Sequence, residues 1–154
     1  MDDLTVCLHA RHRLPGVGEG GGAARDVPAE VYRDAAAVID SAIRGDRDAV
    51  VGAFDAAVDR AGLRGAYDVA CCLAATLVGE DVPDGFAALE YPDIEAARYD
   101  ARWVARFVSA YVNADTPTGE ALFGAAMADG QLSECLVTLA GSTVATIKRR
   151  GADR

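Results

Sequence analysis

Three side chains that could bind a metal ion fall within six residues near the start of the chain: Cys7, His9 and His12. A stable zinc site needs a closed tetrahedral set of ligands, and these two histidines are the only ones in the sequence. The other three cysteines show neither CxxC spacing nor a disulfide framework. Because a free cysteine behaves as a small apolar residue, we expect buried free thiols and no bound metal.

The sequence also lacks an arrangement typical of catalysis or cofactor binding. Asp55 and Asp59 share one face of a predicted helix, but a lone carboxylate pair with Arg60 beside it is typical of solvated surface. Gly16 and Gly18 do not lie between a strand and a helix, as a dinucleotide-binding turn requires. We therefore assign no catalytic residue and no cofactor, and favour a non-enzymatic role. An active site built from Asp, Arg and Tyr residues that only the fold brings together stays open.

One predicted helix, residues 93–114, carries a row of aromatic side chains. At about 100° per residue, four of them follow one another in i, i+4 steps: Tyr99, Trp103, Phe107 and Tyr111. A row of this kind can fill a core, or it can present anchors to a partner chain or to a ligand. Asp100 lies in the same arc near the start of the helix, and we expect its carboxyl group to reach solvent.

The same segment carries a row of arginines at the same spacing: Arg98, Arg102 and Arg106. Guanidinium groups in a row can receive an anionic ligand or an acidic partner, although exposed rows commonly pair with carboxylates such as Glu95. Together, the four aromatic residues and the three arginines are our candidate surface for a ligand or a partner.

Helical periodicity extends through most of the chain and predicts the elements that hold these residues. Gly45-Asp46 and Asp115-Thr116-Pro117 each end one helix and cap the next. We expect an all-α fold, a six-helix bundle, with helices at 26–44, 46–62, 64–79, 93–114, 116–129 and 131–150. Residues 1–25 are rich in glycine and predict a flexible N-terminal arm and linker ahead of a single helical domain at 26–151.

The two halves of this domain resemble each other. A shift of 69 positions superposes identical residues: Asp46 on Asp115, Phe54 on Phe123, Ala56 on Ala125 and Ala57 on Ala126. Residues 26–80 and 93–151 would then be two copies of a three-helix unit. Chance similarity between alanine-rich helices explains the match equally well, and both interpretations give six helices.

Composition limits the classes of partner and the location. The net charge of −9 and the pI of about 4.6 argue against nucleic-acid binding, because phosphates are repelled at long range. No apolar stretch reaches the roughly 20 residues of a membrane-spanning helix, and the first residues, with Asp2 and Asp3, do not read as a secretory signal. Lys148 is the only lysine, a bias typical of a GC-rich bacterial genome. We expect a bacterial cytoplasmic protein.

Residues 139–149, LAGSTVATIKR, resemble the turn and recognition helix of helix-turn-helix regulators of the lactose-repressor type. The resemblance implies a first helix at 133–140, a turn at Gly141 and DNA contacts from residues that follow it: Thr143, Thr146, Lys148, Arg149 and Arg150. The apolar periodicity of the segment continues through Gly141, however, which predicts one continuous helix instead.

The hypothesis we prefer is a helical protein–protein interaction or regulatory module that is not an enzyme and that associates with itself as a homo-oligomer or with another protein. One alternative is a ligand-binding bundle with a pocket near Trp103 and Phe107 and an arginine for an anion. The other is a DNA-binding regulator that uses residues 133–150.

Overall fold

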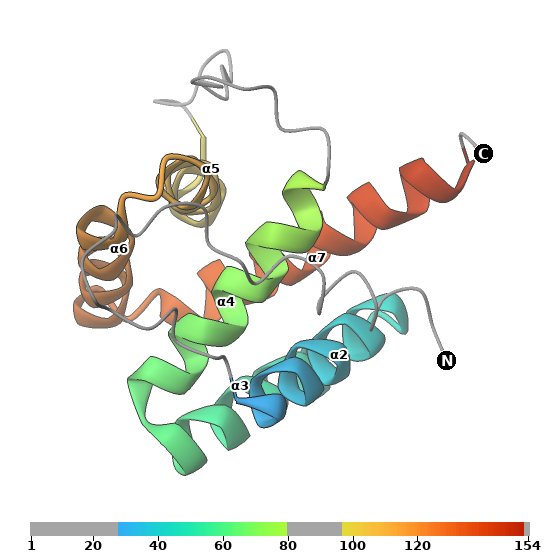
Figure 1. Cartoon of the computed structure of the whole chain (residues 1–154), viewed down its shortest axis with the longest axis horizontal. Coiled ribbons are helices and arrows are strands. Elements are labelled where there is room, and N and C mark those ends of the chain that lie inside the picture. The colour runs from blue at the N-terminus through green and yellow to red at the C-terminus, as the bar shows by residue number, and fades with distance from the viewer. Residues whose placement is uncertain (1–27, 80–96, 153–154) are drawn as a thin grey trace, which may run out of the picture.

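The structure is a computed structural model that describes residues 28–79 and 97–152. These residues form helices and connecting turns without a strand, which confirms the all-α prediction (Figure 1). The predicted N-terminal arm, with Cys7, His9 and His12, lies outside the described residues. Within the described ranges the helices are α2 (Ala29–Ile43), α3 (Arg47–Ala61), α4 (Leu63–Val78), α5 (Tyr99–Val112), α6 (Thr116–Ala128) and α7 (Leu132–Ala152).

The predicted aspartate caps define the starts of α3 and α6. The carboxylate of Asp46 accepts a hydrogen bond from the backbone N–H of Ala49 at 3.0 Å, and Asp115 accepts one from Thr118 at 3.2 Å. Each bond satisfies a backbone donor that has no partner within the first turn of its helix. Gly62, with a φ of 69°, separates α3 from α4.

The predicted start of the fourth helix is wrong. We expected it at residue 93, but α5 begins at Tyr99, and Ala97 and Arg98 are not helical. Arg98 has an extended backbone with a ψ of 157°, so no helix can run through it. Residues 93–96, including Glu95, lie outside the described part of the chain.

The last helix is continuous, as its periodicity predicted. α7 spans 21 residues and passes through Gly141 without a break. The turn that the resemblance to helix-turn-helix regulators implies is therefore not formed. Among the described residues, no helix is both long enough and apolar enough to cross a membrane.

The second half of the described chain repeats the first element by element. α3 and α6 begin 69 positions apart, as do α4 and α7, and α2 and α5 begin 70 positions apart. The backbone repeats as well: the N–H of Asp46 donates to Ser41 at 3.0 Å, and that of Asp115 to Ala110, 69 positions beyond Ser41, at 2.8 Å. We call α2–α4 and α5–α7 the two units, and they have the same hydrogen-bonded corner between their first two helices.

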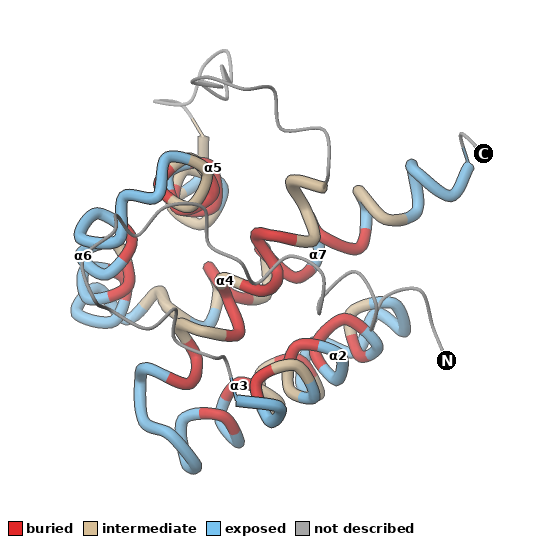
Figure 2. Tube along the Cα trace, viewed as in Figure 1, coloured by how far each residue is buried: buried red, intermediate tan, exposed pale blue. Residues whose placement is uncertain are grey.

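The units meet through their third helices. α4 and α7 pack against each other in the middle of the molecule, and both α2 and α5 pack on this pair (Figure 1). Buried positions face this centre, whereas the outer sides of α2, α3 and α6 are exposed (Figure 2). The units differ in one respect, because α3 packs on α2, α4 and α7, whereas α6 packs chiefly on α5.

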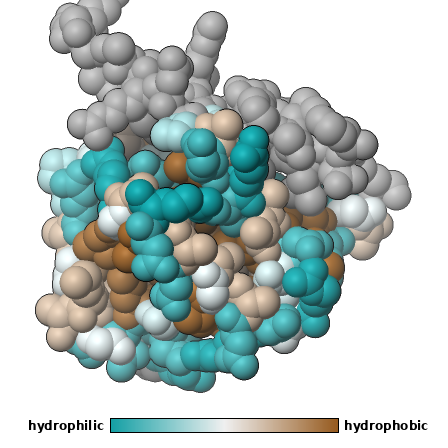
Figure 3. All heavy atoms as spheres, turned by 90° about the horizontal axis from the view of Figure 1, so that it is seen from below, coloured by the Kyte–Doolittle hydropathy of each residue, from teal (hydrophilic) through white to brown (hydrophobic). Residues whose placement is uncertain are grey.

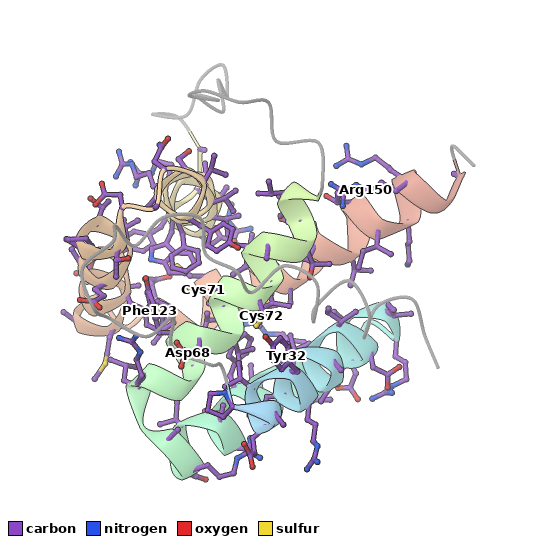
Figure 4. The ribbon with its side chains drawn as sticks, in the orientation of Figure 1. Tyr32, Asp68, Cys71, Cys72, Phe123 and Arg150 are labelled. Atoms are coloured by element: carbon purple, nitrogen blue, oxygen red, sulfur yellow. The ribbon has the colours of Figure 1, made fainter. Side chains whose placement is uncertain are left out.

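Arg150, near the end of α7, binds the end of α4. Its guanidinium donates to the backbone oxygens of Thr76 at 2.9 Å and Leu77 at 2.8 Å, in the last turn of α4 (Figure 4). Carbonyls in the last turn of a helix have no partner within that helix, so Arg150 acts as a cap supplied by α7. Gly79, which follows α4, has a φ of 73° and a ψ of −167°, a conformation that essentially only glycine adopts.

Candidate functional site

The middle of the aromatic row is core. Trp103 and Phe107 are 3% and 1% exposed, and their rings stack with centroids 4.8 Å apart and planes 6° from parallel. Phe123 of α6 points into the same cluster, with its centroid 5.8 Å from that of Trp103 (Figure 4). Tyr67 of α4 meets Phe107 edge-on at 6.0 Å. Three helices therefore share one aromatic cluster.

A hydrogen bond ties Trp103 to this position. Its indole Nε1 donates to the backbone oxygen of Leu122 in α6 at 2.9 Å. A buried indole needs such an acceptor, because leaving its N–H unpaired would carry the full cost of desolvation. Trp103 and Phe107 consequently hold α6 on α5 within one chain. Tyr99 and Tyr111, the outer members of the row, are half-buried and pack against the hydrophobic core.

The three predicted arginines do not form one row on a helix. Arg98 lies outside α5, is exposed, and places its Nε 3.5 Å from the carboxylate of Asp100. Arg102 is half-buried, and its Nε is covered without a hydrogen-bond partner among the described residues. Arg106 is exposed one turn further along α5. Arg102 and Arg106 thus lie one turn apart on α5, and Arg98 is the residue directly before its first turn.

Polar side chains gather where α5 begins and α6 gives way to α7. The Tyr99 hydroxyl donates to Asp129 at 2.6 Å, and the Thr138 hydroxyl donates to Asp100 at 2.5 Å. The bond to Asp129 is the main cause that raises the pKa of Tyr99 to about 12. Both bonds fix the start of α5 against the next two elements of the chain.

Asp100 reaches solvent only in part, since the residue is half-buried and its side chain is 14% exposed. The hydrogen bond from Thr138 nonetheless lowers the pKa of this carboxyl group, with the charge of Arg98 adding to the effect, while burial acts in the opposite direction. Asp100 therefore remains ionised at neutral pH, and both of its neighbours stabilise the charged form.

The described cysteines are buried or half-buried free thiols, as predicted. Burial is the main cause that raises the pKa of Cys71, Cys72 and Cys135 to about 12 in each case. A thiol in this state carries no nucleophilic thiolate at neutral pH. Within the described ranges, no group of three His, Cys, Asp or Glu side chains could hold a metal ion.

The sequence analysis missed an exposed surface on α6. The buried side of this helix carries Phe123 and Ala126, and the opposite side faces solvent. We call that side the α6 stripe. It consists of five exposed residues at helical spacing: Pro117, Ala121, Gly124, Ala125 and Ala128. Met127 flanks the α6 stripe and is 57% exposed, the largest value among the exposed large hydrophobic residues described.

Charge is almost absent from this helix. Glu120 is the only charged residue between Thr116 and Ala128, and it lies beside the α6 stripe rather than on it. Seen from below, the lower left of the surface, on the side where α6 lies, is mostly apolar or neutral in colour (Figure 3). A count of charges along residues 116–128 would have revealed this surface from the sequence.

The repeat supplies a reference for this stripe. Its counterpart on α3, 69 positions earlier, is also exposed, and it carries three carboxylates. The counterpart residues are Asp48, Gly52, Asp55, Ala56 and Asp59. Two equivalent helix faces, both open to solvent, thus differ by three negative charges.

Comparison with protein-family models gives no match, and neither do comparisons with the curated proteins and with the solved structures.

Proposed function

We propose that this chain is a non-enzymatic helical module that binds another protein chain through the α6 stripe, and that this partner is a second copy of itself. The observation that carries the proposal is an exposed helix face without charge. A surface helix normally carries polar or charged residues on the side that faces water. The outer side of α6 carries small uncharged residues instead, and the helix is covered chiefly by α5.

The comparison with α3 supports this interpretation. The counterpart of the α6 stripe on α3 also faces water, and it carries three carboxylates, Asp48, Asp55 and Asp59. Carboxylates keep a helix face hydrated and discourage association. The corresponding positions on α6 are proline, glycine and alanine, so only the second unit lacks carboxylates that would oppose association.

Charge also favours a second copy at this place. Two chains of net charge −9 repel each other over most of their surfaces. On the α6 stripe, two copies can approach without opposing carboxylates. The small side chains of Ala121, Gly124 and Ala128 allow helix axes to come as close as about 8 Å, which increases packing contacts between backbones.

The size of the α6 stripe limits the expected affinity of the dimer. A helix of 13 residues is roughly 20 Å long, and one such face buries less than the about 800 Å² per partner of a stable interface. We therefore expect a weak and reversible dimer, with a dissociation constant of about 0.01–1 mM.

Sedimentation velocity over a range of protein concentrations tests the proposal. The wild-type sedimentation coefficient should rise with concentration, and Ala125→Asp should abolish the rise by placing a carboxylate on the α6 stripe. The matched control is Ala56→Asp, which adds the same charge at the equivalent exposed position of α3 and should leave association intact.

Three results would count against the proposal. A wild-type chain that stays monomeric at the highest concentrations would exclude self-association. Equal association of Ala125→Asp and Ala56→Asp would show that another surface is used. Loss of association in Ala56→Asp alone would assign the contact to α3.

Two broader features belong to the same proposal. A regulatory role would follow if the monomer and the dimer bind different partners. The other is a location in the bacterial cytoplasm: the described cysteines, Cys71, Cys72 and Cys135, are free thiols, and reducing compartments keep cysteines unpaired.

A further inference from the structure

We draw no further inference here: the strongest candidate, the polar cluster where the start of α5 meets the end of α6 and the start of α7, already pairs Tyr99 with Asp129 and Thr138 with Asp100, and nothing in the structure shows what would bind the one covered donor beside it, Arg102 Nε.

Discussion

Polar atoms inside the helices find acceptors close by. The Thr143 hydroxyl, in a fully buried residue, donates to the backbone oxygen of Leu139 at 2.8 Å, and the Ser41 hydroxyl donates to Ala37 at the same distance. Trp103 differs, because its acceptor belongs to another helix. The Thr143 hydroxyl also lies 3.4 Å from the backbone oxygen of Leu73 in α4. The indole has the shorter bond between two helices, at 2.9 Å, and its loss should cost more than the loss of a bond within one helix.

We predict that Trp103→Phe lowers the free energy of unfolding by about 1–3 kcal/mol, because it removes both buried ring volume and the bond to Leu122. Urea unfolding followed by far-UV circular dichroism measures the change. Tyr99→Phe is the control, since it deletes a hydroxyl bond to Asp129 at the surface and should cost no more than about 1 kcal/mol. The account fails if the control costs as much as Trp103→Phe.

Asp100 makes the stability depend on pH in a predictable direction. Its pKa in the folded chain lies below that of the unfolded chain. The ionised group therefore stabilises the fold at neutral pH, and this contribution disappears as the pH falls through the range of about 4 and below. Thr138→Val removes the main cause of the lowered pKa with little change in shape.

The variant should lose stability at neutral pH and approach the wild type in acid, since protonated Asp100 has no charge for Thr138 to stabilise. Urea midpoints measured from neutral pH to about pH 3 give the comparison. A constant difference between Thr138→Val and wild type at every pH would mean that packing, and not the charge of Asp100, explains the loss.

At the scale of elements, the repeated corner is the clearest feature. The residue before each capping aspartate has a positive φ, 70° at Gly45 and 53° at Ala114. Glycine adopts this conformation without strain, whereas alanine pays roughly 1–2 kcal/mol for it. The two units thus have the same backbone conformation at this corner, but glycine at position 45 adopts it without strain and alanine at position 114 does not.

Opposite effects are therefore expected from reciprocal substitutions at the corner. Gly45→Ala should destabilise the chain by about 1 kcal/mol, and Ala114→Gly should stabilise it by up to a similar amount. Thermal unfolding gives both shifts under one set of conditions. Shifts of the same sign would contradict the equivalence of the two corners.

At the scale of the whole molecule, the end of α7 is fixed to the end of α4. Arg150 supplies both hydrogen bonds of this contact, to Thr76 and Leu77. Its neighbour Arg149 donates within α7, to the Thr146 hydroxyl at 3.4 Å, and has no other hydrogen bond to the described residues. The two adjacent arginines therefore form a matched pair for testing the contact.

Arg150→Ala should speed amide hydrogen exchange in the last turns of α4 and α7, because it frees carbonyls that the guanidinium now caps. Exchange in the buried middle of α7, around Leu139, should stay unchanged. Arg149→Ala should leave both helix ends protected. If the two variants behave alike, the contact with α4 does not hold these ends together.

Local chemistry explains how much of this fold could be predicted. Asp46, Asp115 and Gly62 define helix boundaries through their own caps or turns, so the sequence was sufficient there. The start of α5 was misplaced because no side chain caps it. Its position depends instead on contacts such as those of Tyr99 and Asp100 with the end of α6 and with α7.

The site residues show a second limit. Periodicity identified the aromatic row correctly, but a helical period does not say what covers a face. Trp103 and Phe107 are covered by Phe123, which lies on another helix. The contact of Arg150 with the end of α4 could not be predicted either, since its acceptors Thr76 and Leu77 lie more than 70 positions away in the sequence.

Trp103 is the only tryptophan of the chain, so its fluorescence reports on a single place, the joint between α5 and α6. Separation of these helices would admit water to the indole and shift its emission to longer wavelengths. Docking of a partner on the outer side of α6 would leave the spectrum unchanged. The molecule thus carries a built-in optical probe that distinguishes opening of this joint from binding beside it.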